Sequence, residues 1–204
     1  MEQIYFGQRI AALRKGRGMT QEALAQQLGI PCYDHELIVK MAEQSGFTAE
    51  YVAENQESAG PGSWLTGAFS GRSYPGFSNQ DYLWKVQRQV ILELAEQGPC
   101  VIVGRGADYI LRDQADCLRV FIHADMETRA HRIVAQYGER DQAPEKRLRD
   151  KDKRRAAYYQ LYTDRKWGAV ENYDITLNSG VLGLESCVAI LAQLYKAPHA
   201  DGGI

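Results

Sequence analysis

The stretch ELAEQGPCVIVGRGADYIL, residues 93–111, decides the fold class of this 204-residue chain. It opens on a helical pattern that Gly98 and Pro99 end, because both residue types commonly follow a helix C-terminus. The four apolar residues 100–103 then have the length and composition of a fully buried strand. Gly104-Arg105-Gly106 closes that strand before a short helical stretch. A helix, a strand and a helix in succession predict an α/β protein with a parallel sheet.

The same alternation continues on both sides of this stretch. Apolar residues recur at helical spacing before it, and two further runs of strand length follow it, each leading into another helical pattern. The predicted elements are helices over 5–16, 20–28, 34–46, 48–52, 83–94, 109–111, 126–137 and 184–194, a polar and helical segment over 138–168, and strands over 100–103, 118–122 and 174–178. We therefore expect an α/β fold in which helices flank a parallel sheet.

Two segments show neither helical nor strand periodicity in their apolar residues. Residues 58–79 are rich in glycine and serine and predict a long mobile loop. Residues 198–204 predict a loose tail.

Composition and charge exclude several classes of protein. Hydrophobic residues make up 45% and charged residues 25% of the chain, which are ordinary globular values. A net charge of −2 argues against coating of nucleic acid by bulk charge, so nucleic acid is not the expected partner. The four cysteines are widely spaced and form no C-x-x-C pair, so neither a zinc site nor another metal site is predicted. With no signal peptide and no long uncharged apolar run, we expect a cytoplasmic protein without a membrane span.

Positive charge is concentrated in one segment. Residues 138–166 hold ten basic and six acidic residues, whereas the rest of the chain holds 14 basic and 20 acidic residues. Guanidinium groups suit phosphate oxygens, so a helix carrying this charge is a candidate site for a multiply charged anion. The alternative is a solvated helix face with ion pairs four residues apart. The basic residues close enough to converge are Arg147, Arg149, Lys151, Lys153, Arg154 and Arg155.

The glycine-flanked Arg105 is a second candidate. It follows a predicted buried strand, and open parallel sheets bind ligands outside the carboxyl ends of their strands. Asp108 could bond a base or a sugar, or cap the following turn instead. A tight strand-to-helix turn explains the two glycines about equally well.

Five long segments, in order, carry a family resemblance that covers most of the chain. The segments are LGIPCYDHELI (28–38), ELAEQGPCVIVGRGADYIL (93–111), LRVFIHADMETRAHRI (118–133), DKDKRRAAYYQLYTDRKWG (150–168) and NYDITLNSGVLGLE (172–185). From Leu28 to Leu194 the chain resembles the cytidylate kinase-like family of nucleoside monophosphate kinases. The resemblance implies transfer of the γ-phosphoryl group of ATP, bound with Mg²⁺, to CMP, dCMP or a related acceptor.

The resemblance also implies roles for individual residues. The segment 138–168 would be a basic lid that closes over the phosphates, with Lys151, Arg154 and Arg155 as catalytic residues. The acceptor nucleotide would be bound by a second set of residues. That set is Tyr33, Asp34, Arg105, Asp108 and Lys153.

The N-terminus departs from the family pattern. No G-x-x-x-x-G-K-[ST] phosphate loop occurs anywhere in the chain, so no residues are predicted to bind the donor. Residues 6–30, FGQRIAALRKGRGMTQEALAQQLGI, resemble instead the first two helices of a Cro or phage-repressor helix-turn-helix. We therefore predict a helical hairpin over 1–30, in place of the first strand and phosphate loop, and a kinase-like domain over 31–197. If the chain forms a homodimer, these N-terminal helices are the expected contact.

Three functions stay open at this point. The first is the kinase, and the second is a catalytically weak protein that senses nucleotide or phosphate and regulates through its N-terminus. The third, a DNA-binding regulator, requires a recognition helix that the sequence does not supply.

Overall fold

A computed structural model of the chain describes residues 20–55, 79–114 and 116–197. The predicted helix over 5–16, the loop over 58–79 except its last residue, and the tail over 198–204 lie outside these ranges. The elements are α2 (Thr20–Leu28), β1 (Cys32–Tyr33), α3 (His35–Ser45), α4 (Ala49–Asn55), α6 (Asn79–Glu96), β2 (Val101–Ile102), α7 (Ala107–Ile110), β3 (Val120–His123), α8 (Met126–Tyr137), α9 (Pro144–Thr163), the 3₁₀ helix η1 (Val170–Asn172), β4 (Ile175–Asn178), α10 (Ser179–Leu182) and α11 (Leu184–Lys196). The prediction of strands alternating with helices is confirmed.

The strands form two separate parallel pairs within the described residues. In the first pair Cys32 of β1 lies opposite Val101 of β2, and in the second Val120 of β3 lies opposite Ile175 of β4. The prediction of parallel pairing is therefore confirmed, whereas the single sheet is replaced by two short ones. The prediction of a fully buried strand at 100–103 was wrong, because Val101 and Ile102 are only half-buried. Of the described strands, only β1 pairs with β2, so one edge of β2 has no strand neighbour.

The larger core lies between α3 and α6. On α6 the buried side chains recur three and four residues apart, as the sequence predicts, and they meet Leu37 and Met41 of α3, both fully buried. The buried residues of α6 are Leu83, Val86, Gln87, Val90, Ile91 and Leu94. This packing makes α6 a fixed base, and the loop after β2 is built on it.

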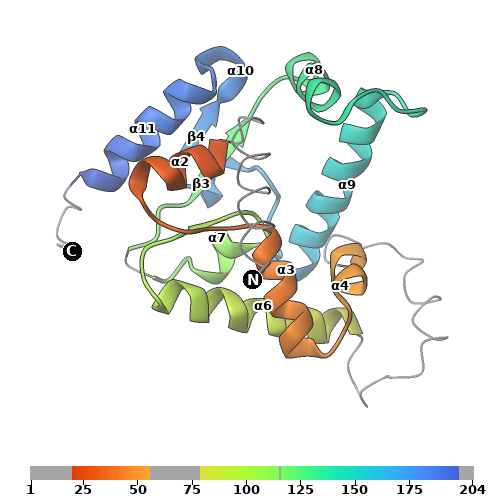
Figure 1. Cartoon of the computed structure of the whole chain (residues 1–204), viewed down its shortest axis with the longest axis vertical. Coiled ribbons are helices and arrows are strands. Elements are labelled where there is room, and N and C mark those ends of the chain that lie inside the picture. Colours follow the sequence, from red (N-terminus) through yellow and green to blue (C-terminus); the bar gives the residue numbers. More distant parts are fainter. Residues whose placement is uncertain (1–19, 56–78, 115, 198–204) are drawn as a thin grey trace, which may run out of the picture.

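The smaller core lies under α11. Leu177 of β4 packs with Cys187 and Leu191 of α11, and Leu24 of α2 packs against the same cluster. Helix α2 lies alongside α11 (Figure 1). The second helix of the predicted N-terminal hairpin is therefore present and packed on the α/β body, while its first helix lies outside the described residues.

Helices α8 and α9 form an arm along one side of the molecule (Figure 1). The two guanidinium Nη atoms of Arg129 on α8 donate to the two carboxylate oxygens of Asp152 on α9, at 2.7 and 2.8 Å. A bidentate pair of this kind fixes orientation as well as distance. Asp125 caps α8 by accepting from the Thr128 amide at 2.8 Å. The predicted segment 138–168 is thus one long helix, α9, with a loop at each end.

Candidate functional site

The loop Gly104-Arg105-Gly106, between β2 and α7, has an unusual backbone. Its three residues are all left-handed, with φ angles of 67°, 59° and 65°. Among the described residues, only Arg105 and Asp164 are non-glycine residues with positive φ. Such a conformation costs an L-residue about 1–2 kcal/mol, so the surrounding structure must hold Arg105 in place. The loop closes with the Ala107 amide donating to the Gly104 carbonyl at 3.0 Å.

Helix α6 supplies two of the groups that hold this loop. The side-chain amide of Gln87, which is fully buried, donates to the Arg105 carbonyl oxygen at 2.7 Å. The ring of Trp84 lies against Gly106, where a Cβ atom would stand 3.2 Å from the ring. Position 106 therefore suits glycine for two reasons, its positive φ and the close approach of the indole.

Three tyrosines of α9 contact the two helices that flank this loop in the fold, α6 and α7. The Tyr159 hydroxyl donates to the Asp108 carboxylate at 2.6 Å. Tyr162 stacks on Trp84 with ring centroids 4.6 Å apart, and Tyr158 meets the same indole edge-on at 6.0 Å. Helix α9 is therefore joined to α7 and to the indole ring that lies against Gly106.

Asp108 is engaged with the protein itself. Burial raises the pKa of its carboxyl group, and the hydrogen bond from Tyr159 only partly offsets that effect. Burial and the nearby Asp108 charge together raise the pKa of Tyr159 as well. The sequence prediction placed Asp108 against the substrate. In the structure its carboxylate accepts from the Tyr159 hydroxyl, which joins α7 to α9, and contact between Asp108 and the acceptor stays a prediction.

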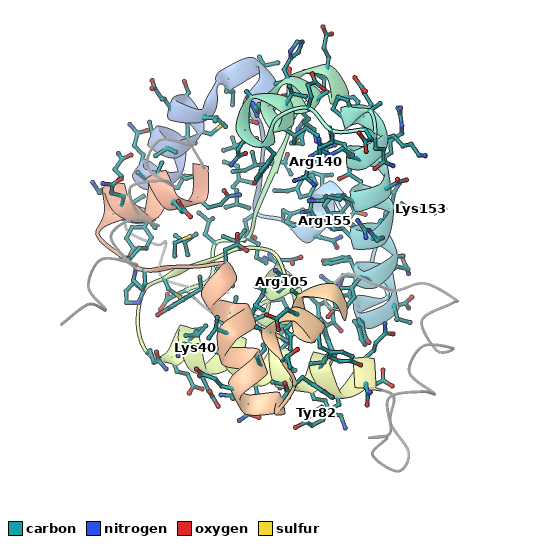
Figure 2. All side chains as sticks on the ribbon, turned by 45° about the vertical axis from the view of Figure 1, so that its right-hand side comes forward. Lys40, Tyr82, Arg105, Arg140, Lys153 and Arg155 are labelled. Carbon is teal, nitrogen blue, oxygen red and sulfur yellow. The ribbon has the colours of Figure 1, made fainter. Side chains whose placement is uncertain are left out.

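The predicted basic residues of α9 divide between two faces. Lys151 and Arg155, four residues apart, share one face, and Arg154 lies at the edge of that face beside Lys151. Arg155 is half-buried and lies on the side of α9 that faces the strands (Figure 2). Lys153 lies on the opposite side and is exposed (Figure 2), because a spacing of two residues turns a helix by about 200°. The structure thus groups Lys151 and Arg155 but not Lys153.

Arg147 extends the inner face of α9 by one turn before Lys151. Its Nη1 atom is buried and has no hydrogen-bond partner among the described residues. A buried guanidinium nitrogen without an acceptor is uncommon, and an anion would satisfy it. The basic pattern of the segment included Arg147, but nothing in the sequence separated it from its exposed neighbours. Arg140, in the loop before α9, lies on the same inner side (Figure 2).

Tyr33 and Asp34 lie at the carboxyl end of β1, next to the arginine loop in the fold. Tyr33 pairs with Ile102, and its carbonyl oxygen accepts from the Val103 amide at 3.0 Å. Asp34 follows directly and makes no side-chain capping bond to α3. The carboxyl ends of β1 and β2 therefore bring Tyr33, Asp34 and Arg105 to one edge, which is where parallel sheets bind ligands.

Neither a metal cluster nor a membrane helix is found in the described part of the chain. No three His, Cys, Asp or Glu side chains gather there closely enough to hold a metal ion. None of its helices is both long and apolar enough to cross a membrane.

Comparisons with known proteins show the family of the chain and a similar fold. The sequence matches the cytidylate kinase-like family over residues 19–181, a range that includes α2. No curated protein is similar enough to the chain to count as a match. The fold is similar to the crystal structure of an uncharacterized protein from Eubacterium ventriosum, with a TM-score of 0.65 and 23% sequence identity, over 88% of this chain and 90% of that one. At that level of identity the likeness concerns the fold alone.

Proposed function

The chain belongs to the cytidylate kinase-like family, and from this premise we propose that it is a phosphotransferase whose acceptor is CMP or dCMP and whose donor is ATP bound with Mg²⁺. One observation carries the proposal. Arg105 is held in a strained backbone conformation at the carboxyl end of β2, and α7, which follows its loop directly, is hydrogen-bonded through Asp108 to Tyr159 of the basic helix α9. Strain of this kind is concentrated at ligand-binding sites.

The charge and the position of three residues support binding of the acceptor at this end of the site. A guanidinium group presents paired N–H donors that match phosphate oxygens, so Arg105 is suited to bind the monophosphate. Tyr33 and Asp34 at the same edge are suited to contact the rest of the acceptor. Lys151, Arg154 and Arg155 would neutralise charge on the transferring phosphoryl group, since phosphoryl transfer depends mainly on positioning and on cations. Arg147 joins them because its buried nitrogen lacks an acceptor.

The donor end is different, because the residues present do not fit the family's way of binding ATP. The glycine-rich phosphate loop that would wrap the donor phosphates is missing from the whole sequence.

A second candidate function follows from the missing phosphate loop. A protein that binds the monophosphate without transferring a phosphoryl group would act as a sensor of CMP, dCMP or phosphate. It would need the acceptor end and the basic face of α9 but no donor loop. The missing phosphate loop favours this candidate, whereas the family favours the kinase.

The two functions are separated by measuring binding and transfer in one preparation. Calorimetry measures CMP affinity, and chromatography measures CDP formed from CMP and MgATP. Arg155→Ala is expected to weaken CMP binding and to abolish any transfer, because it removes charge from the inner face of α9. Lys146→Ala is the matched control, because it removes an exposed cation of the same helix that lies outside the proposed site, and it should leave both unchanged.

Each outcome has a definite meaning. CDP formation that Arg155→Ala abolishes supports the kinase. CMP binding without CDP supports the sensor. If CMP, dCMP and inorganic phosphate all fail to bind at millimolar concentration, both functions are refuted.

A further inference from the structure

Gln87 is a buried polar residue to which sequence reasoning assigns no role. It lies in the middle of α6 among apolar neighbours, and none of its surface is exposed. A side-chain amide in such a place normally has a structural partner, because an unsatisfied buried amide is costly. Its partners here are the two elements that carry the proposed phosphate-binding cations.

The first partner is the backbone of Arg105. The Gln87 Nε2 atom donates to the Arg105 carbonyl oxygen at 2.7 Å, which is a short hydrogen bond for an amide donor. Arg105 has a φ of 59°, so this bond holds a conformation that the residue would otherwise leave. That backbone conformation sets the direction in which the Arg105 side chain projects from the loop.

The second partner is α9. The Tyr158 hydroxyl lies 3.5 Å from the Gln87 Oε1 atom, at the long limit of hydrogen bonding. The Tyr158 ring also meets Trp84, which packs on Gly106. One amide group therefore touches both the arginine loop and the basic helix.

From this geometry we infer that Gln87 is a positioning residue: it sets the Arg105 backbone so that the guanidinium binds the acceptor phosphate. The inference rests on the proposed acceptor site and extends it to a residue that never touches substrate. Gln87 acts through Arg105, so its effect must disappear when the Arg105 side chain is absent. That dependence separates positioning from a general contribution to folding.

A double-mutant cycle tests the inference, with calorimetric CMP affinity as the readout. Gln87→Met keeps an unbranched side chain of similar length and removes the donor. It is expected to weaken CMP binding about tenfold, which corresponds to about 1.4 kcal/mol. In an Arg105→Ala background the same substitution is expected to change CMP affinity less than twofold. Gln89→Met, an identical change at an exposed position of α6, is the matched control and should leave CMP affinity as it is.

Three results bear on the inference. Equal weakening by Gln87→Met in both backgrounds overturns it, because the loss would then not pass through Arg105. Unchanged CMP affinity in Gln87→Met overturns the inference alone and leaves the acceptor site standing. Absence of CMP binding by the wild-type chain overturns the acceptor site and the inference together.

If Gln87→Met does not fold, a second variant tests the same inference. Gln87→Asn keeps the amide but is one methylene shorter, so the donor no longer reaches the Arg105 carbonyl. It is expected to show the same tenfold loss and the same dependence on Arg105, and an unchanged affinity overturns the inference.

Discussion

Replacing Arg105 by glycine should make the protein more stable and less able to bind CMP. The left-handed backbone costs arginine about 1–2 kcal/mol relative to glycine. The greater freedom of glycine in the unfolded chain offsets about 0.5–1 kcal/mol of that gain. The net gain expected for Arg105→Gly is therefore between about 0 and 1.5 kcal/mol, or up to roughly 6 °C in the melting temperature of a chain of this length.

Binding should change in the opposite direction. A hydrogen bond to a charged group contributes about 1.5–3 kcal/mol, so loss of the guanidinium should weaken CMP binding roughly 10- to 150-fold. Thermal unfolding and calorimetry on the same samples measure the two effects. Together they would identify Arg105 as a residue kept for function at a cost in stability.

Asp164 provides the matched control. It has a φ of 55° at the C-terminal cap of α9, and its side chain makes only an exposed bond to Gln160. Asp164→Gly should give a similar gain in stability with no change in CMP affinity. The reasoning is refuted if Arg105→Gly lowers the melting temperature while Asp164→Gly raises it, since Arg105 would then be a structural residue.

Three further substitutions test the contacts around the loop. Gly106→Ala should destabilise the fold by about 1–2 kcal/mol in urea unfolding, because a Cβ at positive φ also meets Trp84 at 3.2 Å; an unchanged midpoint would contradict this. Tyr159→Phe should cost about 1–3 kcal/mol because it removes the hydroxyl that bonds the Asp108 carboxylate, and a loss under 0.5 kcal/mol would show that water replaces it. Burial raises the pKa of Asp108, so its neutral form favours folding below pH 3.8 and that contribution is lost as pH rises through the folded pKa. Asp108→Asn should therefore gain more stability over wild type at pH 7 than at pH 4, and equal gains at both pH values would refute the burial argument.

The sequence predicts best those elements whose pattern is local. The spacing of Leu83, Val90 and Leu94 is enough to identify α6, and the apolar runs identify β2, β3 and β4 within two or three residues. Strand β1 is missed because two residues after a proline show no alternation. The sequence also does not predict that the strands form two separate pairs, because pairing depends on which strands meet in space.

The site is less predictable, because its contacts join residues far apart in the chain. Asp108 and Tyr159 are 51 positions apart in the sequence, and Gln87 and Tyr158 are 71 positions apart. No local sequence pattern therefore predicts either contact. Local charge does predict that α9 is basic. It cannot tell Arg155, on the inner face, from Lys153 on the outer one, until the packing of the helix is known.

A crystal structure of the chain with CMP tests the central claim most directly. The account predicts the phosphate within hydrogen-bond distance of the Arg105 guanidinium, on the side of α9 that carries Arg155. A phosphate bound elsewhere, with Arg105 turned away from it, would contradict the account.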